Sequence, residues 1–425
     1  MSALRKVLIV NTSDVGGGAE SVATTLLDGF EELGTETWLV VGSKESDHPR
    51  VIPVFASPRV DYRPFGSRRR RGARALRRGV ERRLGLEDFS NPYTRLIPEL
   101  AGSRPDAILC NNLHGGYFDL RAMQGISRIP TVLRLADSWP FTGHCAVPPG
   151  CDRWLHGCGS CPDLATPPAI RRDVTRVNWK RKRRIWARSR VYATSPSSWL
   201  LERARRSSLA AAIVESAVIP NGVDLGTFRP DGPVGERTRG LPRLLFVANG
   251  GARNPHKDFE TIRRAVRGLA RPVELLVVGA AEEGEERDGA ARIRHHERQP
   301  PVRLAALYRS ADAYVHAAPS ESFSLTCAEA LACGRPVAVA AAGGVAEVVR
   351  DGATGLITKP GDAPALGAAL ERLLGDRALR RRMSERAAED ARARFDRDRM
   401  VRQLHRLCER AAAGGHRVRQ HGEQS

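Results

Sequence analysis

The sequence predicts an α/β fold made of two doubly wound domains. Short, continuously apolar segments alternate with segments of helical periodicity along most of the 425 residues. Buried strands of this kind are typical of parallel sheets covered by helices on both faces. The alternation stops in a stretch rich in Pro, Gly, Asn and Asp, at 217–237, and then starts again. Such a stretch is typical of a linker between domains.

The elements of the first domain follow from periodicity. Residues 19–33 place Val22, Leu26 and Phe30 at helical spacing, which predicts a helix between the first two strands. The expected strands of this domain are 5–11, 36–42, 106–111, 131–137, 191–195 and 216–220.

The second half repeats the strand and helix alternation. Its expected strands are 243–249, 273–279, 313–318, 336–341 and 355–358, and its expected helices lie near 257–270, 301–310, 324–333, 343–350 and 364–375. The resulting organisation is an N-terminal domain at 1–216, a linker at 217–237, a C-terminal domain at 238–375, helices at 376–412 that return toward the N-terminal domain, and a disordered tail at 413–425. Ligands of doubly wound sheets bind beyond the carboxyl ends of strands, so we expect the site in a cleft between the domains.

Composition restricts the class of protein. Apolar residues make up 41% of the chain, which is too many for a disordered protein. No run of about 18 apolar residues predicts a membrane-spanning helix, and the apolar stretch at 7–10 is too short for a signal peptide. We therefore expect a cytoplasmic protein whose eight cysteines are buried or bound to metal rather than paired in a disulfide framework.

The net charge of +20 is concentrated in two segments. Residues 63–83 carry ten Arg and one Glu, and residues 171–190 carry ten Lys or Arg and one Asp, so each segment has a net charge of +9. Local patches of this kind suit an anionic membrane surface or an anionic ligand as well as nucleic acid. A solvated helix face is the plain alternative.

One segment after a predicted strand carries two spaced glutamates at the start of a helix. Glu321 precedes the helix and Glu329 lies about one turn inside it. The loop of Phe323, Ser324 and Leu325 would direct backbone N–H groups at an anion. A carboxylate accepts two hydrogen bonds from vicinal ribose hydroxyls, and one at the strand end reaches a sugar beyond the phosphates. On this spacing alone, a capped helix with two surface glutamates is the favoured interpretation.

Further motifs reverse that preference. Segments 332–337, 343–347 and 351–356 read Ala-Cys-Gly-Arg-Pro-Val, Gly-Gly-Val-Ala-Glu and Asp-Gly-Ala-Thr-Gly-Leu. With the two glutamates, they resemble family-four glycosyltransferases of the GT-B fold over most of 241–375. The resemblance implies two Rossmann-like domains facing across a cleft, a UDP- or GDP-sugar donor bound mainly by the C-terminal domain without a catalytic metal, and transfer with retention of anomeric configuration.

The resemblance also implies roles for single residues. Glu329 would hold the ribose, Glu321 would contact the donor sugar, and the amides of the 323–325 loop would hold the diphosphate. Lys257 matches a lysine that binds the diphosphate in the family, whereas Arg253 lies near the family's arginine but out of register with it. An ordinary lysine at a helix start is the plain alternative for Lys257.

The first turn of the N-terminal domain is rich in glycine. Gly17 and Gly18 connect the first strand to the first helix, where glycine lets the backbone approach a ligand closely. A plain tight turn is an equal alternative. The turn resembles the Gly-Gly-Ala-Glu loop of family-four enzymes, which faces donor phosphate and acceptor.

A second resemblance concerns a subgroup. Segments 111–116, 137–145 and 151–162 resemble exopolysaccharide and capsule glycosyltransferases related to colanic-acid enzymes, which implies a glycan or lipid-linked acceptor. The subgroup has a histidine directly before Asp137, where this chain has Ala136, so either activity is weakened or the acceptor differs. His114, from the neighbouring strand end, would partly substitute; a core histidine is its alternative.

Four cysteines cluster in the insert 138–165. Cys145, Cys151, Cys158 and Cys161 have the spacing C-x5-C-x6-C-x2-C. Four thiolates suit a tetrahedral structural zinc, and a closed shell leaves no open position for catalysis. Reduced thiols that pack the insert, or two disulfides, are the alternatives.

The basic segments predict electrostatic docking to anionic lipid, and hence a peripheral protein at the inner face of the plasma membrane. Trp179 and Trp186, in the second segment, would suit the membrane interface. Two other functions would require features beyond these. A sugar-nucleotide epimerase or hydrolase of the same fold needs further catalytic carboxylates or histidines in the N-terminal domain, and a nucleic-acid-binding protein needs a recognised module. Neither feature is evident, so we expect no nucleic-acid partner.

Overall fold

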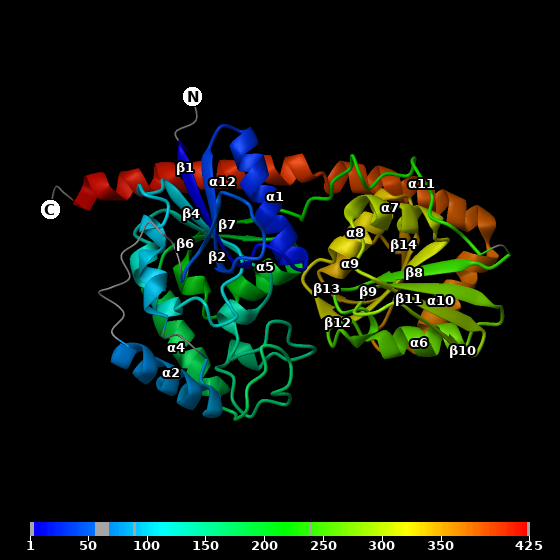
Figure 1. The fold of residues 1–425 in the computed structure, drawn as a ribbon, viewed down its shortest axis with the longest axis horizontal. Helices are drawn as coiled ribbons and strands as arrows, with labels where there is room; N and C mark the ends of the chain where they lie inside the picture. Colours follow the sequence, from blue (N-terminus) through cyan, green and yellow to red (C-terminus); the bar gives the residue numbers. More distant parts are fainter. Residues whose placement is uncertain (1–3, 56–67, 88–90, 239, 423–425) are drawn as a thin grey trace. The chain divides into compact units, whose positions relative to one another are not determined.

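The computed structural model describes residues 4–55, 68–87, 91–238 and 240–422 (Figure 1). The chain forms two compact units, of which the first comprises Met1–Ile219 and Val401–Ser425 and the second comprises Pro220–Met400. The boundary between Ile219 and Pro220 falls inside the Pro- and Gly-rich stretch at 217–237.

The first unit contains a parallel sheet, which has seven strands among the described residues, in the order β3-β2-β1-β4-β5-β6-β7. The strand order reverses between β1 and β4, and the carboxyl ends of such neighbouring strands mark the usual ligand position of a doubly wound sheet. The strands are β1 Lys6–Ser13, β2 Glu36–Ser43, β3 Val51–Pro53, β4 Ala107–Cys110, β5 Thr131–Arg134, β6 Val191–Ser195 and β7 Ile213–Val218.

The helices of the first unit include the one that periodicity predicted. α1 (Gly18–Glu32) buries Val22, Leu26 and Phe30 on one face, as their spacing requires. The others are α2 Arg68–Arg83, α3 Met123–Ile126, α4 Thr175–Trp186 and α5 Ser198–Arg205, with short 3₁₀ helices at Pro92–Glu99, Leu120–Ala122, Trp139–Phe141, Arg153–Leu155 and Ala210–Ala212.

The second unit contains another sheet, with seven strands in the described part of the chain, in the order β10-β11-β9-β8-β12-β13-β14. Helices cover both of its faces, with α8 on one side and α6 on the other (Figure 1). Its strands are β8 Arg243–Val247, β9 Val273–Ala280, β10 Gly284–Asp288, β11 Ala291–Glu297, β12 Ala313–Glu321, β13 Val337–Gly343 and β14 Gly355–Thr358. Its helices are α6 Phe259–Arg267, α7 Pro301–Ser310, α8 Leu325–Ala332, α9 Val345–Val348, α10 Ala363–Gly375 and α11 Arg377–Arg394, with a 3₁₀ helix at Gly251–Arg253.

One edge of this sheet differs from the prediction of parallel strands only. β10 pairs with β11 in the antiparallel direction. The sequence did not reveal this hairpin, because its strands carry charged residues, such as Glu285 and Arg292, which pair across the strands at 2.8 Å. A strand without an apolar run has no signal in a search for buried strands.

The last helix joins the two units in sequence. α12 spans Arg397–Gly422, and its residues from Val401 onward belong to the first unit. There, His405 Nε2 lies 2.8 Å from Thr35 Oγ1 in the first unit. Of the segment 413–425, for which a disordered tail was expected, the residues as far as Gly422 belong to this helix, and residues 423–425 lie outside the described residues. Extending an existing helix is favoured over starting one, and the preceding Ala411–Ala413 are strong helix formers.

Candidate functional site

The carboxyl ends of β8 and β12 bring two predicted residues of the second unit together. These strands are parallel neighbours, so the segments that follow them leave the same edge of the sheet. Lys257 lies just before α6, and Glu321 is the last residue of β12. Lys257 Nζ and Glu321 Oε1 lie 2.6 Å apart, with side-chain exposures of 17% and 19%.

A buried histidine contacts the other oxygen of Glu321. His316 Nε2 lies 2.6 Å from Glu321 Oε2, and the His316 side chain is fully buried. Burial alone would raise the pKa of Glu321, but Lys257 and then His316 hold that pKa well below its usual range. Glu321 is therefore a fixed carboxylate and a poor proton acceptor at neutral pH. The sequence signal for His316 was a polar residue within the apolar strand 313–318.

An irregularity in the sheet places Glu321. The register between β12 and β13 shifts between Ala318 and Glu321, where Glu321 pairs with Gly343. Gly343 has φ +85°, and a Cβ at this residue would lie 2.5 Å from the carbonyl oxygen of Glu321. Only glycine allows this approach, so Gly343 sets the position of the glutamate.

Glu329 lies in α8, half-buried, and has one hydrogen-bond donor in the structure. The hydroxyl of Tyr308 donates to Glu329 Oε2 at 3.0 Å and also contacts the carbonyl oxygen of Thr326 at 3.1 Å. Burial raises the pKa of Glu329 to about 7, although the Tyr308 hydrogen bond lowers it. A ligand that donates further hydrogen bonds to Glu329 would favour its charged form.

The loop between β12 and α8 has a strained backbone at the predicted anion-binding position. Ser324, the N-cap of α8, has φ +85°, and its Oγ accepts from Cys327 N at 3.4 Å. Left-handed geometry is costly for a residue other than glycine and is concentrated at functional sites. Phe323 is 2% exposed and packs against Phe395, so its side chain is not a ligand contact. Leu325 is half-buried, and its contribution would come from the backbone.

Arg253 does not join this group. It lies exposed in the 3₁₀ helix Gly251–Arg253, and within the described residues no hydrogen bond or ion pair links it to Lys257 or Glu321. Ala252, which occupies the position of the family's arginine, packs against the hydrophobic core.

In the first unit, the carboxyl ends of β4 and β5 bring His114 and Asp137 together. His114 Nε2 lies 3.1 Å from Asp137 Oδ2, with side-chain exposures of 26% and 13%. Asp137 Oδ1 accepts from Trp139 N at 2.8 Å, which fixes the carboxylate. Burial alone would lower the pKa of His114, but Asp137 outweighs it, and the pKa lies above its ordinary value. The structure therefore brings together two residues that the resemblance named separately.

In the glycine-rich turn, a side chain of α1 binds the backbone at the N-terminus of the helix. The N–H of Gly17, the N-cap of α1, donates to Glu20 Oε2 at 2.9 Å. This N–H therefore already has a partner within the turn. Gly18 is the first residue of α1.

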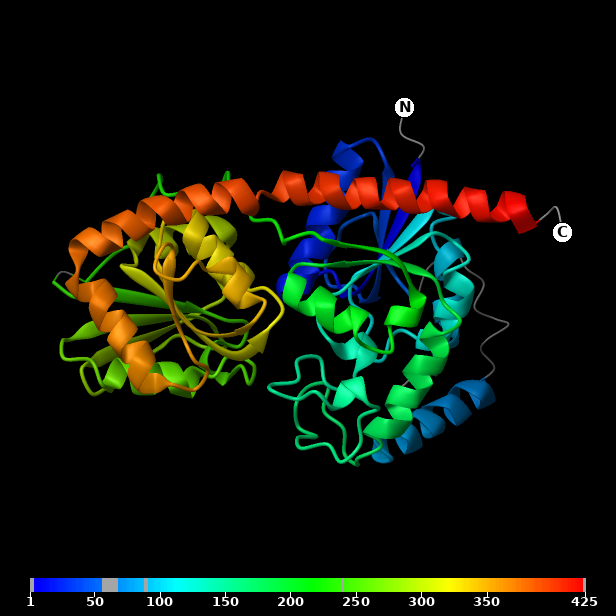
Figure 2. The same cartoon turned by 180° about the vertical axis from the view of Figure 1, so that it is seen from behind.

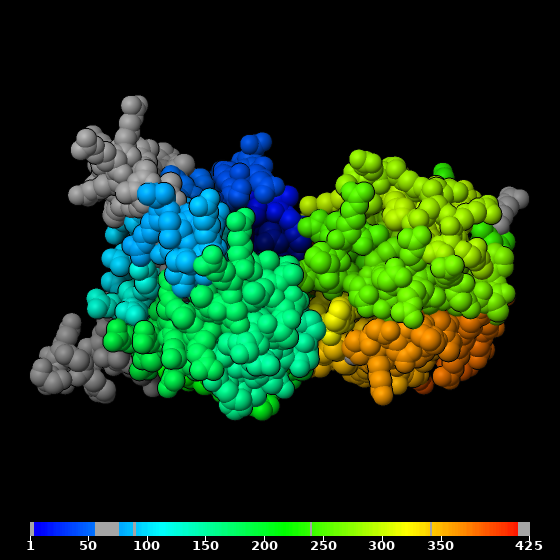
Figure 3. Space-filling view, turned by 90° about the horizontal axis from the view of Figure 1, so that it is seen from below, coloured from blue at the N-terminus to red at the C-terminus, as the bar shows by residue number. Residues whose placement is uncertain are grey.

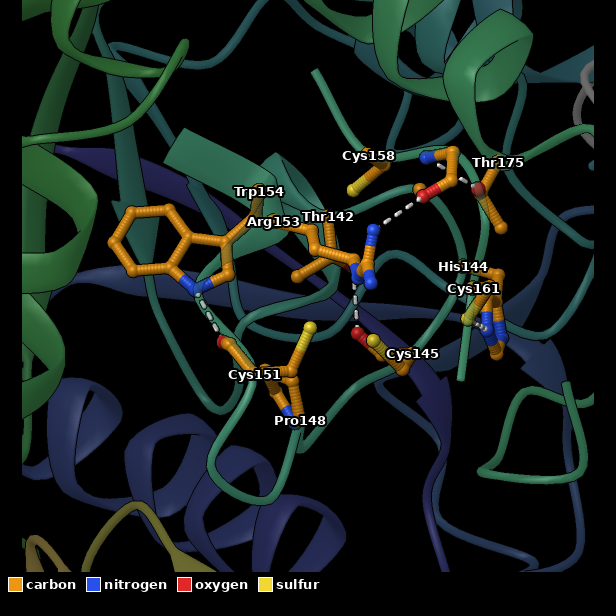
Figure 4. A pocket seen from close by; sticks show the side chains of 12 residues that line it. Thr142, His144, Cys145, Pro148, Cys151, Arg153, Trp154, Cys158, Cys161 and Thr175 are labelled. Carbon is orange, nitrogen blue, oxygen red and sulfur yellow. Dashed lines mark hydrogen bonds between the residues drawn. The ribbon is translucent and has the colours of Figure 1, made fainter. Parts of the chain in front are cut away.

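The four clustered cysteines line one pocket of the first unit, together with His144 (Figure 4). The insert that carries them lies at the surface of this unit (Figure 3). All four are free thiols, so the two disulfides are not formed. Burial raises the pKa of Cys145 to about 12 and that of Cys158 to about 11. In the described part of the chain, no three His, Cys, Asp or Glu are arranged to hold a metal ion, so the expected zinc geometry is absent there.

A buried lysine, which the sequence analysis counted only as basic charge, anchors the start of this insert. Lys182 Nζ lies 2.9 Å from Glu87 Oε2 and donates to the carbonyl oxygens of Trp139 and Thr142 at 2.7 and 3.1 Å. The Lys182 side chain is fully buried. An interior lysine in an amphipathic helix is indistinguishable by spacing from a surface one, which explains why it was missed.

The structure does not support the expected membrane role of the two tryptophans in the second basic segment. Trp179 and Trp186 are 8% and 0% exposed, so they belong to the core and not to a membrane interface. Their indole nitrogens donate to the carbonyl oxygens of Trp154 and Pro140.

The first basic segment forms α2, which lies beside α4 in both views (Figures 1 and 2). Residues 63–67 of this segment lie outside the described residues. Within the described residues, no helix has the length and apolarity needed to cross a bilayer.

Comparisons with known proteins agree with the fold. Residues 241–390, which contain Lys257, Glu321 and Glu329, match the family model described as glycosyl transferases group 1. A D-inositol 3-phosphate glycosyltransferase of Nocardia farcinica is 37% identical over 196 residues, which is 41% of this chain and 43% of that relative. The chain thus matches less than half the length of this relative.

Solved structures with the same architecture cover almost the whole chain. Sucrose-phosphate synthase from Thermosynechococcus elongatus has a TM-score of 0.68 at 18% identity, over 96% of this chain and 100% of that one. HepE of Anabaena, in complex with UDP-glucose, has a TM-score of 0.61 at 16% identity, over 96% and 99%. Two parallel α/β domains with these neighbours define the GT-B architecture.

Proposed function

We propose that the protein is a glycosyltransferase of the hexosyltransferase type, which moves a sugar from a UDP- or GDP-sugar to a hydroxyl acceptor with retention of anomeric configuration. The observation that carries the proposal is the pair of Lys257 and Glu321 at the carboxyl edge of the second sheet, with Glu329 in the helix that follows. Support comes from the family model over 241–390 and from the UDP-glucose bound by the Anabaena neighbour.

The candidate site residues of the second unit have separate roles in this reaction. Glu329 accepts hydrogen bonds from the ribose hydroxyls, and the amides of Ser324 and Leu325 bind the diphosphate at the start of α8. Lys257 stabilises the negative charge that develops on the leaving diphosphate, without a metal ion. The distance of 2.6 Å between Lys257 and Glu321 couples the diphosphate position to the sugar position.

Glu321 orients the donor sugar and does not act as the general base. Its pKa is lowered by Lys257 and His316 in spite of burial, and a strongly acidic carboxyl group is a weak base. The leaving phosphate then takes the proton of the acceptor hydroxyl, so that bond breaking and bond formation occur on the same face of the sugar. His114 and Asp137, in the first unit, are assigned to the acceptor, and His114 takes over part of the role of the histidine that Ala136 replaces.

The acceptor in this proposal is a lipid-linked glycan of exopolysaccharide, capsule or cell-envelope synthesis, reached at the inner face of the plasma membrane. Support comes from the end of α2, where Leu76 and Val80, and Leu84 directly after the helix, recur every fourth residue and are 73%, 49% and 42% exposed. Arg82 and Arg83 lie in the same exposed stretch. An apolar stripe with flanking arginines suits an anionic lipid surface.

Sugar transfer is tested by incubating the protein with radiolabelled UDP-glucose or GDP-mannose and a bacterial lipid extract. We expect label in the lipid fraction and none with Lys257→Met. Proton NMR of the product reports its anomeric configuration, and inversion would contradict retention. A donor that is epimerised or hydrolysed without transfer would instead support the alternative enzyme class.

Membrane docking is tested separately by flotation with anionic vesicles at low salt. Leu76→Ser with Val80→Ser should reduce the floated fraction, whereas Val302→Ser, which changes a valine 67% exposed in the second unit, should not. Equal flotation of all variants, or no flotation of the wild type, would contradict the assignment of α2.

A further inference from the structure

His316 is a buried polar residue with only one of its two ring nitrogens in use. Its side chain is 0% exposed in β12, and Nε2 lies 2.6 Å from Glu321 Oε2. Within the described residues, Nδ1 is buried and has no hydrogen-bond partner. An unpaired buried polar atom is destabilising, so packing alone would favour an apolar residue at this position. The contact with Glu321 offsets that cost.

The surroundings of His316 hold one orientation and one protonation state. Burial lowers the pKa of His316, although Glu321 opposes this effect, and the positive charge of Lys257 adds to it. A neutral ring with its proton on Nε2 donates to Glu321 and leaves Nδ1 as an unprotonated acceptor. The ring of Tyr314 stacks on the imidazole, with 6.2 Å between centroids and 24° between planes.

The two donors to Glu321 differ in rigidity. Lys257 reaches Oε1 through a flexible stem, and in the proposed function it also binds the donor diphosphate. The terminal torsion of a glutamate is broad, so a carboxylate held at one oxygen is poorly oriented. His316 belongs to the strand that ends in Glu321, and its short side chain is packed on all sides.

We propose that His316 is a positioning residue, which donates from Nε2 to Glu321 Oε2 and keeps the carboxylate oriented toward the donor sugar while Lys257 engages the diphosphate. This inference rests on the proposed function. His316 touches no substrate and acts only through Glu321.

Three substitutions at this residue separate positioning from packing. His316→Gln keeps an N–H near the place of Nε2, His316→Asn moves its N–H toward the place of Nδ1, and His316→Met removes both. Tyr314→Phe is the matched control, because Tyr314 is buried in the same strand and the hydroxyl that this change removes donates to the carbonyl oxygen of Val247.

We expect kcat to fall about tenfold to a hundredfold in His316→Met and His316→Asn, the effect of a lost hydrogen bond to a charged group. His316→Gln should recover most of the activity. The dissociation constant of UDP or GDP should stay within about twofold of the wild type, because those ligands lack the sugar that Glu321 contacts. The acidic limb of the pH–rate profile should move to higher pH in His316→Met, because Glu321 loses a donor that favours its charged form.

Two results would overturn the positioning role: equal kcat for the Gln and Met variants, or a loss that follows thermal stability in all three variants alike. If the wild type binds no nucleoside diphosphate, the proposed function fails. The hydrogen bond from His316 to Glu321 can still be tested separately, because it does not require a ligand. Nitrogen NMR of protein with labelled histidine should show a neutral His316 with its proton on Nε2. An imidazolium, or a proton on Nδ1, would reject the inference.

Discussion

Replacing Lys257 with methionine tests the charge pairing around Glu321. The change removes the ammonium group 2.6 Å from Glu321 Oε1 and leaves an apolar side chain of similar length. A hydrogen bond to a charged group contributes about 1.5–3 kcal/mol, and side-chain exposures of 17% and 19% allow solvent to screen only part of it. We expect the free energy of unfolding to fall by about 1–3 kcal/mol at neutral pH.

The size of this loss depends on pH in a defined direction. Burial raises the pKa of Glu321, but Lys257 and His316 together hold it below the unfolded-state value. The charged carboxylate therefore stabilises the fold above its unfolded pKa of about 4.3 and loses this contribution as pH falls toward the folded value. Lys257→Met raises the folded pKa, so wild type and variant differ most at neutral pH and converge in acid.

Urea denaturation followed by circular dichroism measures the difference. Arg253→Met is the matched control, since Arg253 is exposed in the same loop and its loss should change stability by less than about 0.5 kcal/mol. Combining Lys257→Met with Glu321→Gln should cost less than the sum of the single changes. Additive losses, or a difference that stays constant from neutral to acidic pH, would refute the pairing.

Three further predictions concern other contacts. Burial raises the pKa of Glu329 to about 7, and ribose hydroxyls bind its charged form, so nucleotide affinity measured by calorimetry should rise as the pH increases through this value. The same pH profile in Glu329→Gln would contradict this prediction. Gly343→Ala places a Cβ 2.5 Å from the carbonyl oxygen of Glu321, so the free energy of unfolding should fall by more than the strain of a left-handed alanine, which is about 1–2 kcal/mol. Gly352→Ala, at φ +70° in open space, should show only that strain, and equal melting temperatures of the two variants would reject the clash. Lys182→Met leaves a buried carboxylate unpaired and should cost about 3–5 kcal/mol, so wild-type stability in denaturation would show that the pair is unimportant.

The donor-side residues could be predicted from the resemblance to family-four glycosyltransferases, because spacing alone favoured a capped helix with two surface glutamates. The resemblance assigned Lys257, Glu321 and Glu329 to one donor site, and the structure joins the first two directly. Sheet geometry explains why two of them meet: Lys257 lies beyond the end of β8 and Glu321 ends β12, and these parallel neighbours end at one edge of the sheet. The contact of His114 with Asp137 was not predicted; it follows from the neighbouring carboxyl ends of β4 and β5.

The remaining features depend on contacts that spacing does not encode. The contact of His316 with Glu321 requires the register shift at the end of β12, and Tyr308 reaches Glu329 from another helix. Lys182 and Glu87 meet across 95 residues of sequence. In the basic segment 171–190, the many Lys and Arg residues made the whole helix look exposed. Trp179 was therefore assigned to a membrane interface, although it lies in the core.

Equilibrium binding of UDP and GDP to the wild type and to Glu329→Ala tests the central claim most directly. The proposed site predicts that one of the two nucleotides binds and raises the melting temperature, and that the affinity falls at least about tenfold in the variant, which lacks the hydrogen bonds to the ribose. Absence of binding by both nucleotides, or equal binding by wild type and variant, would contradict a donor site at the carboxyl ends of β8 and β12.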